Sequence, residues 1–152
     1  MTKTEQYSIA SLVTTVLIFL YLTMRLTEDW RFVEATPGFL LTTYVICIVL
    51  VIIAESIWSG VIFSGGSAKT DKDERDLAIE ARAEASAGIF LAIVINVIIV
   101  NTLLRRLYQS DYPVLNEFLE LGSPTEIFYV LFSLLLAGHA VKLVSTLIMY
   151  RK

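Results

Sequence analysis

The stretch DKDERDLAIEARAEASAGIFLAIVINVIIVNTLL, residues Asp71 to Leu104, decides the fold of this chain. It begins as a highly charged segment and becomes a membrane-length apolar run, with neither Gly nor Pro before Gly88. We interpret it as one long helix whose first half, 71–85, stands in water and whose second half, 86–104, crosses a bilayer. Such a helix spans about 50 Å, well beyond the roughly 30 Å hydrocarbon core. We therefore expect the other spans to pack around this rod.

The composition indicates an integral membrane protein. Hydrophobic residues make up 56% of 152 positions, and the mean hydropathy is +0.70. Four apolar segments, 8–26, 39–63, 86–104 and 127–150, are long enough for helical spans. Backbone groups in hydrocarbon must be satisfied within the segment, and no alternating pattern suggests a barrel. The predicted fold is all-α: one four-helix membrane bundle over residues 1–152, with the third helix extended into the cytoplasm.

Cap and turn signals predict where the helices begin. Thr2 and Glu5 have capping-box spacing, Thr36–Pro37 offers a cap followed by proline, and the segment 123–126, SPTE, is a complete cap signature. A turn is predicted at 64–70, with Thr70 or Asp71 capping the long helix. The segment 112–121, YPVLNEFLEL, has the apolar spacing of a short helix lying on the membrane surface.

The distribution of Lys and Arg predicts the orientation. Seven basic residues lie near one end of the spans and four near the other. The larger group is Lys3, Lys69, Lys72, Arg75, Arg82, Arg151 and Lys152, and the smaller is Arg25, Arg31, Arg105 and Arg106. By the positive-inside rule, both termini and the charged loop should be cytoplasmic. The first span lacks a small-residue cleavage pattern and should remain as an anchor.

An intramembrane polar cluster is predicted from Glu55, Asn96, His139 and Lys142. Glu55 and Lys142 each lie roughly 6 Å past the middle of their spans, so an ion pair between them is geometrically available. His139 shares the helix face of Lys142, and Asn96 could hydrogen-bond into the cluster. One interpretation is a proton or cation site, because a buried Glu beside a His can exchange protons near neutral pH. The other is an ion pair that locks the second helix to the fourth.

The charged half of the long helix carries a second group of candidate residues. The cytoplasmic charged motif comprises Asp73, Glu74, Arg75, Asp76, Glu80, Arg82 and Glu84. Four of its acids share one face: Asp73, Asp76, Glu80 and Glu84. That face could hold a divalent cation but is more often a solvated face or one paired with a partner.

Small residues are interleaved with these charges. Ala81, Ala85, Gly88 and Ala92 recur at the spacing that lets helices approach closely, within the chain or across a dimer. The preferred assembly is a two-fold pair of these rods, in which Arg75 and Arg82 of one copy meet acids of the other.

The same stretch resembles a family of small bacterial four-span inner-membrane proteins. The resemblance rests on Asp73-Glu74-Arg75-Asp76, followed by Ile79 and Arg82-Ala83, just ahead of the third span. It implies a multi-pass protein of the bacterial cytoplasmic membrane. It implies no activity, because that family has no agreed one.

Three functions are compatible with these features. The first is a non-enzymatic protein acting by helix–helix association, as a homodimer or larger homo-oligomer or as an accessory subunit of a membrane complex, through the charged cytoplasmic helix. The second is a small proton- or cation-coupled transporter or channel that uses Glu55, His139 and Lys142. An enzyme ranks third, since no nucleophile with a partnered base, phosphate loop or paired-His motif is present, although Glu55, His139 and Asn96 could assemble an intramembrane site.

The expected partner is the lipid bilayer, and the net charge of −3 argues against nucleic acid. No cofactor or metal is expected, because Cys47 is the only cysteine and His139 the only histidine.

Overall fold

Four long helices form this protein. In the computed structural model the described residues are 2–28, 31–63, 74–107 and 123–151. Within them lie α1 (Lys3–Leu26), α2 (Pro37–Phe63), α3 (Glu74–Leu107) and α4 (Pro124–Tyr150), and each is long and apolar enough to cross a membrane. The predicted all-α fold with four helices of membrane-spanning length is therefore confirmed.

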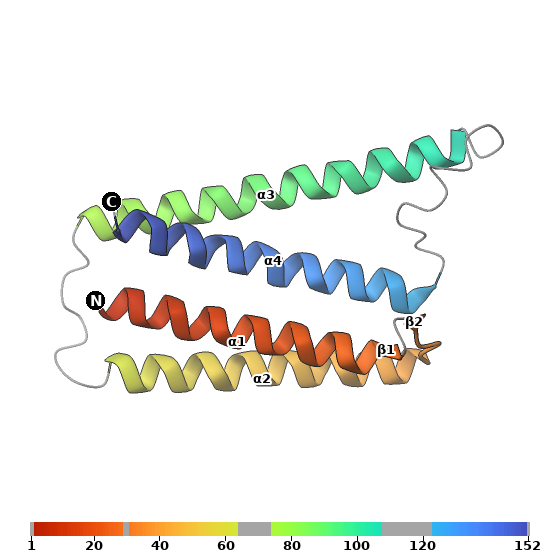
Figure 1. The fold of residues 1–152 in the computed structure, drawn as a ribbon, viewed down its shortest axis with the longest axis horizontal. Coiled ribbons are helices and arrows are strands. Elements are labelled where there is room, and N and C mark those ends of the chain that lie inside the picture. The colour runs from red at the N-terminus through yellow and green to blue at the C-terminus, as the bar shows by residue number, and fades with distance from the viewer. Residues whose placement is uncertain (1, 29–30, 64–73, 108–122, 152) are drawn as a thin grey trace.

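The helices run alternately in opposite directions (Figure 1). Both termini lie at the end of the molecule where α2 ends and α3 begins. We call this the terminal end, and we call the opposite end, where α1 ends and α2 begins, the hairpin end. Each helix thus begins at the end of the molecule where the previous helix stopped.

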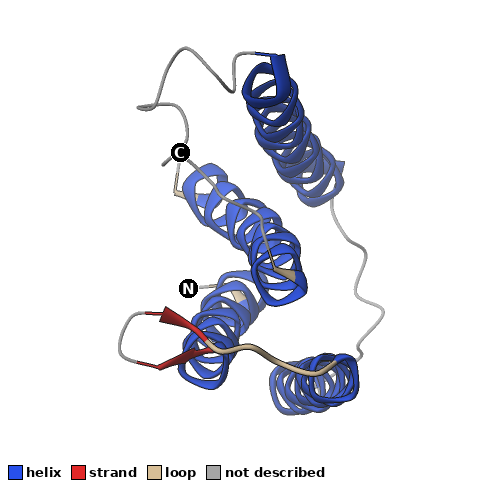
Figure 2. Ribbon diagram, turned by 90° about the vertical axis from the view of Figure 1, so that its right-hand side faces the viewer, coloured by secondary structure: helices blue, strands red, loops and turns tan. Residues whose placement is uncertain are grey.

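The long helix α3 is peripheral. Helices α1 and α4 lie side by side at the centre, α2 flanks α1, and α3 flanks α4, as Figures 1 and 2 show from two directions. The prediction that the other spans pack around the 71–104 rod is therefore wrong. The physical reason lies in the small number of buried side chains on α3: among its described side chains only Ile79 and Ala83 are buried.

Helix α1 is the most buried of the four helices, and one stripe of its surface is buried along the whole length. The buried stripe consists of Ser8, Ser11, Thr15, Ile18, Leu22 and Leu26. Its spacing of three and four residues keeps these side chains on one side of the helix. Small hydroxyl residues occupy the terminal end of the stripe, and larger aliphatic residues occupy the hairpin end.

The predicted helix caps are present. The Thr2 hydroxyl accepts from the Glu5 backbone amide at 3.2 Å, and Ser123 and Glu126 form an equivalent capping box at α4. The Thr36 hydroxyl accepts from the amide of Phe39 at 3.3 Å, and Pro37 is the first residue of α2. The predicted turn and cap at 64–71 and the predicted surface helix at 112–121 lie outside the described residues.

A short hairpin, which the sequence did not predict, follows α1. Strands β1 (Thr27–Glu28) and β2 (Arg31–Phe32) pair antiparallel in the segment between the first two helices. The chain reverses there because α1 ends at Leu26, whose carbonyl accepts a hydrogen bond from the amide of Val33 at 3.0 Å.

The hairpin end ties α1, α2 and α4 together. Arg25 of α1 donates from Nε to the Thr43 hydroxyl of α2 at 3.1 Å, and its guanidinium lies 4.6 Å from the ring centroid of Phe39. On α4, Phe128 and Phe132 stack at 5.8 Å, and Tyr44 of α2 meets both rings edge-on. Aromatic pairs and a cation over a ring each add stabilisation beyond the burial of apolar area. These contacts hold α1, α2 and α4 together at the hairpin end, and we call them the fixed joint.

Helix α3 packs against α4 at a glycine. A Cβ added at Gly138 would lie 2.9 Å from both Cγ and Cδ1 of Leu91. A contact under 3.0 Å forces the Leu91 side chain to move. Glycine at this position therefore sets how near the two helices can lie.

We predict that Gly138→Ala destabilises the protein by about 1 kcal/mol relative to Gly60→Ala, measured by thermal or denaturant unfolding in detergent. Gly60 is the matched control, because its added Cβ would meet nothing within 4 Å, and both changes gain the same helix propensity. Leu91→Ala in the Gly138→Ala background should remove the difference. Equal stability of the two alanine variants would contradict this account of the interface.

Candidate functional site

The candidate site is centred on Glu55 of α2. Its two carboxylate oxygens accept one hydrogen bond each, from the hydroxyl of Tyr7 and from the hydroxyl of Ser11, the latter at 2.5 Å. Tyr7 and Ser11 are four residues apart on α1 and therefore share one helix face. Because Ser11 is fully buried, its hydrogen bond to Glu55 lies inside the contact between α1 and α2.

Ser11 also links the acid to the fourth helix. Its hydroxyl oxygen lies 3.2 Å from Nε2 of His139 on α4. A continuous chain of polar groups thus crosses three helices, in the order Tyr7, Glu55, Ser11 and His139; we call these four residues the Glu55 cluster. Ser11 lies about 12 Å along α1 from its start, so the cluster is displaced toward the terminal end.

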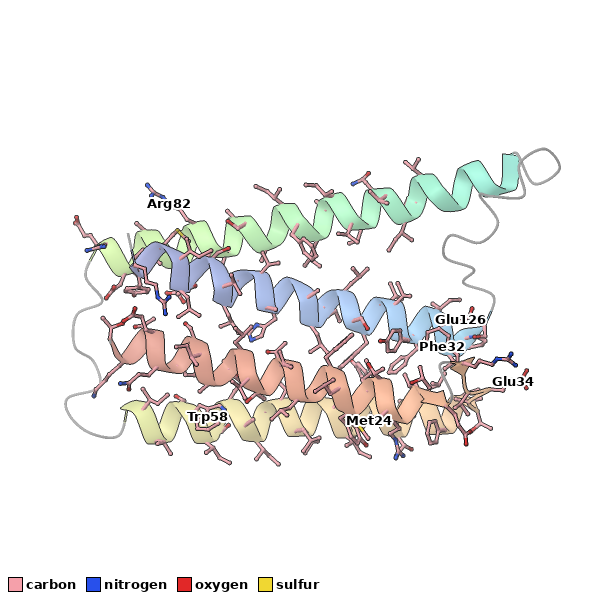
Figure 3. The ribbon with its side chains drawn as sticks, viewed as in Figure 1. Met24, Phe32, Glu34, Trp58, Arg82 and Glu126 are labelled. Carbon is pink, nitrogen blue, oxygen red and sulfur yellow. The ribbon has the colours of Figure 1, made fainter. Side chains whose placement is uncertain are left out.

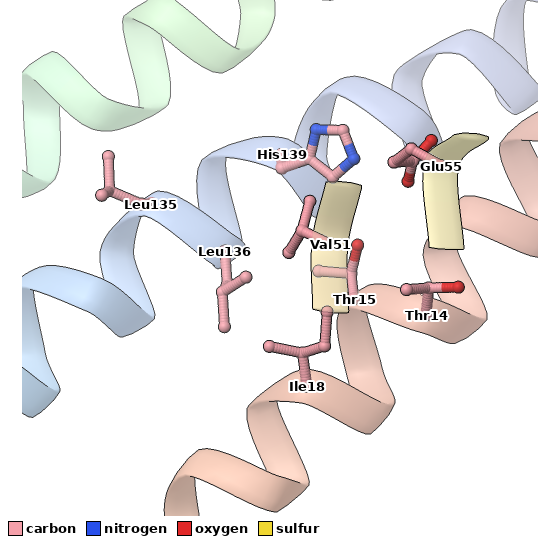
Figure 4. Close-up of a pocket in the computed structure, with 8 residues that line it drawn as sticks. All are labelled: Thr14, Thr15, Ile18, Val51, Glu55, Leu135, Leu136 and His139. Carbon is pink, nitrogen blue, oxygen red and sulfur yellow. The ribbon is translucent and has the colours of Figure 1, made fainter. Parts of the chain in front are cut away.

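A cavity of about 170 Å³ lies beside the Glu55 cluster. It is lined by Thr14, Thr15, Ile18, Val51, Glu55, Leu135, Leu136 and His139. Figure 4 shows Glu55 and His139 along one edge, with Ile18 and Leu136 farther from them. The cavity is therefore apolar over most of its wall and has one carboxylate and one imidazole at its edge.

The two threonines of the wall already have hydrogen-bond partners. The Thr15 hydroxyl donates to the carbonyl of Ser11 at 2.9 Å. The Thr14 hydroxyl donates to the carbonyl of Ala10 at 3.2 Å and accepts from the indole nitrogen of Trp58 at 2.9 Å. Glu55 and His139 are therefore the main polar side chains that a ligand in the cavity could bind.

The structure corrects the predicted partner of Glu55. Lys142 forms an ion pair with Glu84 of α3, with Nζ and Oε1 2.6 Å apart, so the predicted pair of Glu55 with Lys142 is wrong. The prediction compared depths only. Lys142 is about 60° around α4 from His139, and this rotation turns it toward α3 while His139 faces α1.

Asn96 does not join the cluster. Its amide nitrogen donates to the carbonyl of Ala92 at 2.8 Å, and its side chain is exposed on α3. It is excluded because α3 packs along α4 and lies apart from α1 and α2. Of the predicted cluster, only Glu55 and His139 come together at the cavity.

The acidic face of α3 is directed at the fourth helix. Asp76 accepts from the hydroxyl of Tyr150 at 2.6 Å, and Glu84 holds Lys142. Arg82 points away from the other helices (Figure 3). In the described part of the chain no group of three or more His, Cys, Asp or Glu residues could hold a metal ion. Asp73 of the predicted motif lies outside the described residues, and Glu74 and Arg75 are exposed while Glu80 is half-buried.

The predicted small-residue contact is not made within the chain. Ala81, Ala85, Gly88 and Ala92 are all exposed, whereas the buried alanine of this helix is Ala83. Ala81 and Ala85 are each about 160° around the helix from Ala83, so they lie opposite α4. We call the exposed set Ala78, Ala81, Ala85, Gly88 and Ala92 the outer seam; its spacing of three and four residues is that of a coiled-coil contact.

Sequence reasoning missed Tyr7, Ser11, Thr14 and Trp58. The apolar span 8–26 carries no charge before Arg25, so nothing in its composition singles out a site. A signal was present in the regular spacing of the buried stripe, whose first members are serines and a threonine. A span that turns small hydroxyl groups toward its neighbours can hydrogen-bond an acid on one of them.

Comparison with known proteins finds no matching family model, no matching curated protein and no matching solved structure. What the protein does must therefore be inferred from its own geometry.

We predict that Lys142 is energetically coupled to Glu84 and not to Glu55. A double-mutant cycle of Lys142→Met with Glu84→Gln should give a coupling of about 0.5 to 1 kcal/mol, since the two side chains are 32% and 60% exposed and solvent weakens such a pair. The matched cycle with Glu55→Gln should be additive. Unfolding in detergent measures both, and a larger coupling to Glu55 would overturn the assignment.

Proposed function

We propose that this chain is a four-span membrane protein that binds protons or other cations at Glu55 and couples their binding to transport. The observation that carries the proposal is the position of Glu55. This carboxylate lies among α1, α2 and α4 beside a cavity, and none of its hydrogen-bond partners in the described part of the chain is a cation.

The surface of the helices supports insertion in a membrane. Large apolar side chains such as Leu17 and Leu41 are 60% and 64% exposed, and very little of α2 is buried. Exposed apolar area on this scale is costly in water and suits hydrocarbon, where helices with internally satisfied backbones are stable. The bias of Lys and Arg toward the terminal end, together with the Asp-Glu-Arg-Asp resemblance, supports the bacterial cytoplasmic membrane with both termini on the cytoplasmic side.

The bonding of Glu55 supports a cation as ligand. An ionised carboxylate has about four lone-pair positions, and the hydroxyls of Tyr7 and Ser11 use two of them. Charge at membrane depth is costly unless it is paired or reaches water. With Lys142 engaged by Glu84, a cation from outside the chain is the natural partner for this acid.

The packing of the hairpin end supports movement at the terminal end. Arg25 and the aromatic rings already hold α1, α2 and α4 together at the hairpin end. These contacts join the three helices independently of the Glu55 cluster. A polar group beside a cavity, at the end away from the fixed joint, is where helices can shift as a ligand binds.

We predict that Glu55→Gln abolishes proton flux through the protein. Purified full-length protein in proteoliposomes, with a pH-sensitive dye inside and an imposed pH gradient, should carry protons faster than empty liposomes. Glu55→Gln should fall to the rate of empty liposomes, because the amide cannot exchange a proton. Glu74→Gln is the matched control and should retain flux, since Glu74 is exposed at the start of α3 and does not line the cavity.

A Glu55→Gln variant that assembles normally and conducts as well as the unmodified protein would refute the proposal. So would equal loss of flux in both variants, because the effect would then not belong to the cavity.

The outer face of α3 favours a second candidate function, association with another copy or with a larger membrane complex. The outer seam is exposed over about four turns, and Arg82 and Asn96 lie exposed on the same helix. Small side chains allow close helix approach, and an amide at membrane depth favours a hydrogen-bonding partner. In this reading the protein is a non-enzymatic subunit, and Arg75 and Arg82 meet acids of the partner.

We predict that Ala85→Cys forms an intermolecular disulfide in native membranes, tested in a Cys47→Ala background because Cys47 is the sole native cysteine. Ala83→Cys is the matched control and should not cross-link, since Ala83 is buried against α4. A product of twice the chain mass indicates a homodimer, and a different mass indicates another subunit. Absence of any product from Ala85→Cys, or equal products from both variants, would argue against association through the outer seam.

A further inference from the structure

We infer that the cavity beside Glu55 binds a small organic monocation with an apolar body. The inference rests on the proposed cation site and adds the class of its ligand. The carboxylate of Glu55 would hold the cationic end, and the apolar wall would hold the body.

The size of the cavity sets the size of the ligand. Its volume is about 170 Å³. An apolar cavity of about 150 Å³ holds a molecule the size of benzene. The cavity therefore suits a ligand whose body is roughly one ring or a short branched chain.

The wall of the cavity sets the character of the ligand body. Ile18, Val51, Leu135 and Leu136 line most of it, and they offer no hydrogen bond. The hydroxyls of the two lining threonines are bonded to backbone carbonyls of α1. A ligand body with its own polar groups would therefore lose its hydration without compensation, whereas an apolar body gains by leaving water.

The edge of the cavity sets the ligand charge. A small inorganic cation prefers several oxygen ligands, and Glu55 is the sole carboxylate in the described lining. An organic monocation whose charge is spread over apolar groups needs fewer oxygen ligands, because it loses less hydration free energy when it leaves water. An uncharged ligand would cover Glu55 without pairing its charge, so it is disfavoured.

Protons compete with such a ligand for the same carboxylate. The groups that face Glu55 are Tyr7 and Ser11 from α1 and His139 from α4, while Lys142 of α4 is paired with Glu84 of α3. Protonation of Glu55 removes the negative charge that holds the cation. Affinity should therefore weaken as pH falls, by up to about tenfold per pH unit where one proton is displaced per ligand. This exchange is the coupling that a proton-driven exporter of organic cations needs.

The test measures binding of benzyltrimethylammonium to the purified full-length protein in detergent by isothermal titration calorimetry. The charge of this probe is fixed at every pH, so any pH dependence belongs to the protein. Glu55→Gln should weaken binding roughly ten- to a hundredfold, as expected for loss of one charged contact. Glu74→Gln is the matched control and should bind like the unmodified protein, because Glu74 is exposed at the start of α3 and does not line the cavity.

A second variant tests the cavity without touching the charge. Val51→Phe fills part of the space and should reduce affinity while leaving Glu55 in place. Trp58 supplies a check on the site, since its indole is bonded to the cavity-lining Thr14. In a Trp30→Phe background it is the sole tryptophan, and its fluorescence should change on ligand addition.

Binding that needs Glu55, weakens at low pH and is reduced by Val51→Phe would support the inference. No binding of the probe, or binding unchanged in both Glu55→Gln and Val51→Phe, would overturn it. If the probe does not bind but Glu55-dependent proton flux persists, the ligand class is wrong and the proposed function stands. If Glu55-dependent flux is also absent, the proposed function fails with it.

Discussion

The arrangement of this protein depends on the close contact of α1 with both α2 and α4. Ser8, Ser11 and Thr15 make that contact possible, because their side chains are short and their hydroxyl groups can be satisfied locally or across the interface. Ser11 is the central member: it is fully buried and bonded to Glu55 on one side and adjacent to His139 on the other. A bulkier residue there would separate three helices at once, and the acid would lose a donor.

The two ends of the α1, α2 and α4 unit are built from different chemistry. At the hairpin end, rings from α2 and α4 interlock and Arg25 spans α1 and α2. At the terminal end, the helices meet through hydroxyl, carboxylate and imidazole groups beside a cavity. Polar contacts can exchange partners with a ligand or a proton at little cost, whereas interlocked rings resist movement. This difference is the physical basis for assigning function to the terminal end.

Helix α4 divides its polar side chains between its two neighbours. His139 faces α1 and so belongs to the Glu55 cluster, while Lys142 faces α3 and binds Glu84. Tyr150 continues the same division by bonding Asp76 of α3. Asp76 and Glu84 of α3 are therefore bonded by side chains of α4, whereas Glu55 is bonded by hydroxyl groups of α1. The outer seam, whose five residues are all exposed, leaves a second surface for association.

The sequence by itself determined the number and length of the helices, their alternating direction and several of their ends. These features are local: apolar length predicts a span, and a cap needs only residues three positions apart. It also singled out Glu55 and His139, because an ionisable group in an apolar run is costly wherever it points. Only the tertiary structure decided which helix lies at the centre, which partner each acid takes and which face of α3 stays exposed. Those outcomes depend on how each helix is rotated about its axis relative to its neighbours. His139 and Lys142 are three residues apart and therefore about 60° apart around α4. Only the packing of the helices decides that the first faces α1 and the second faces α3.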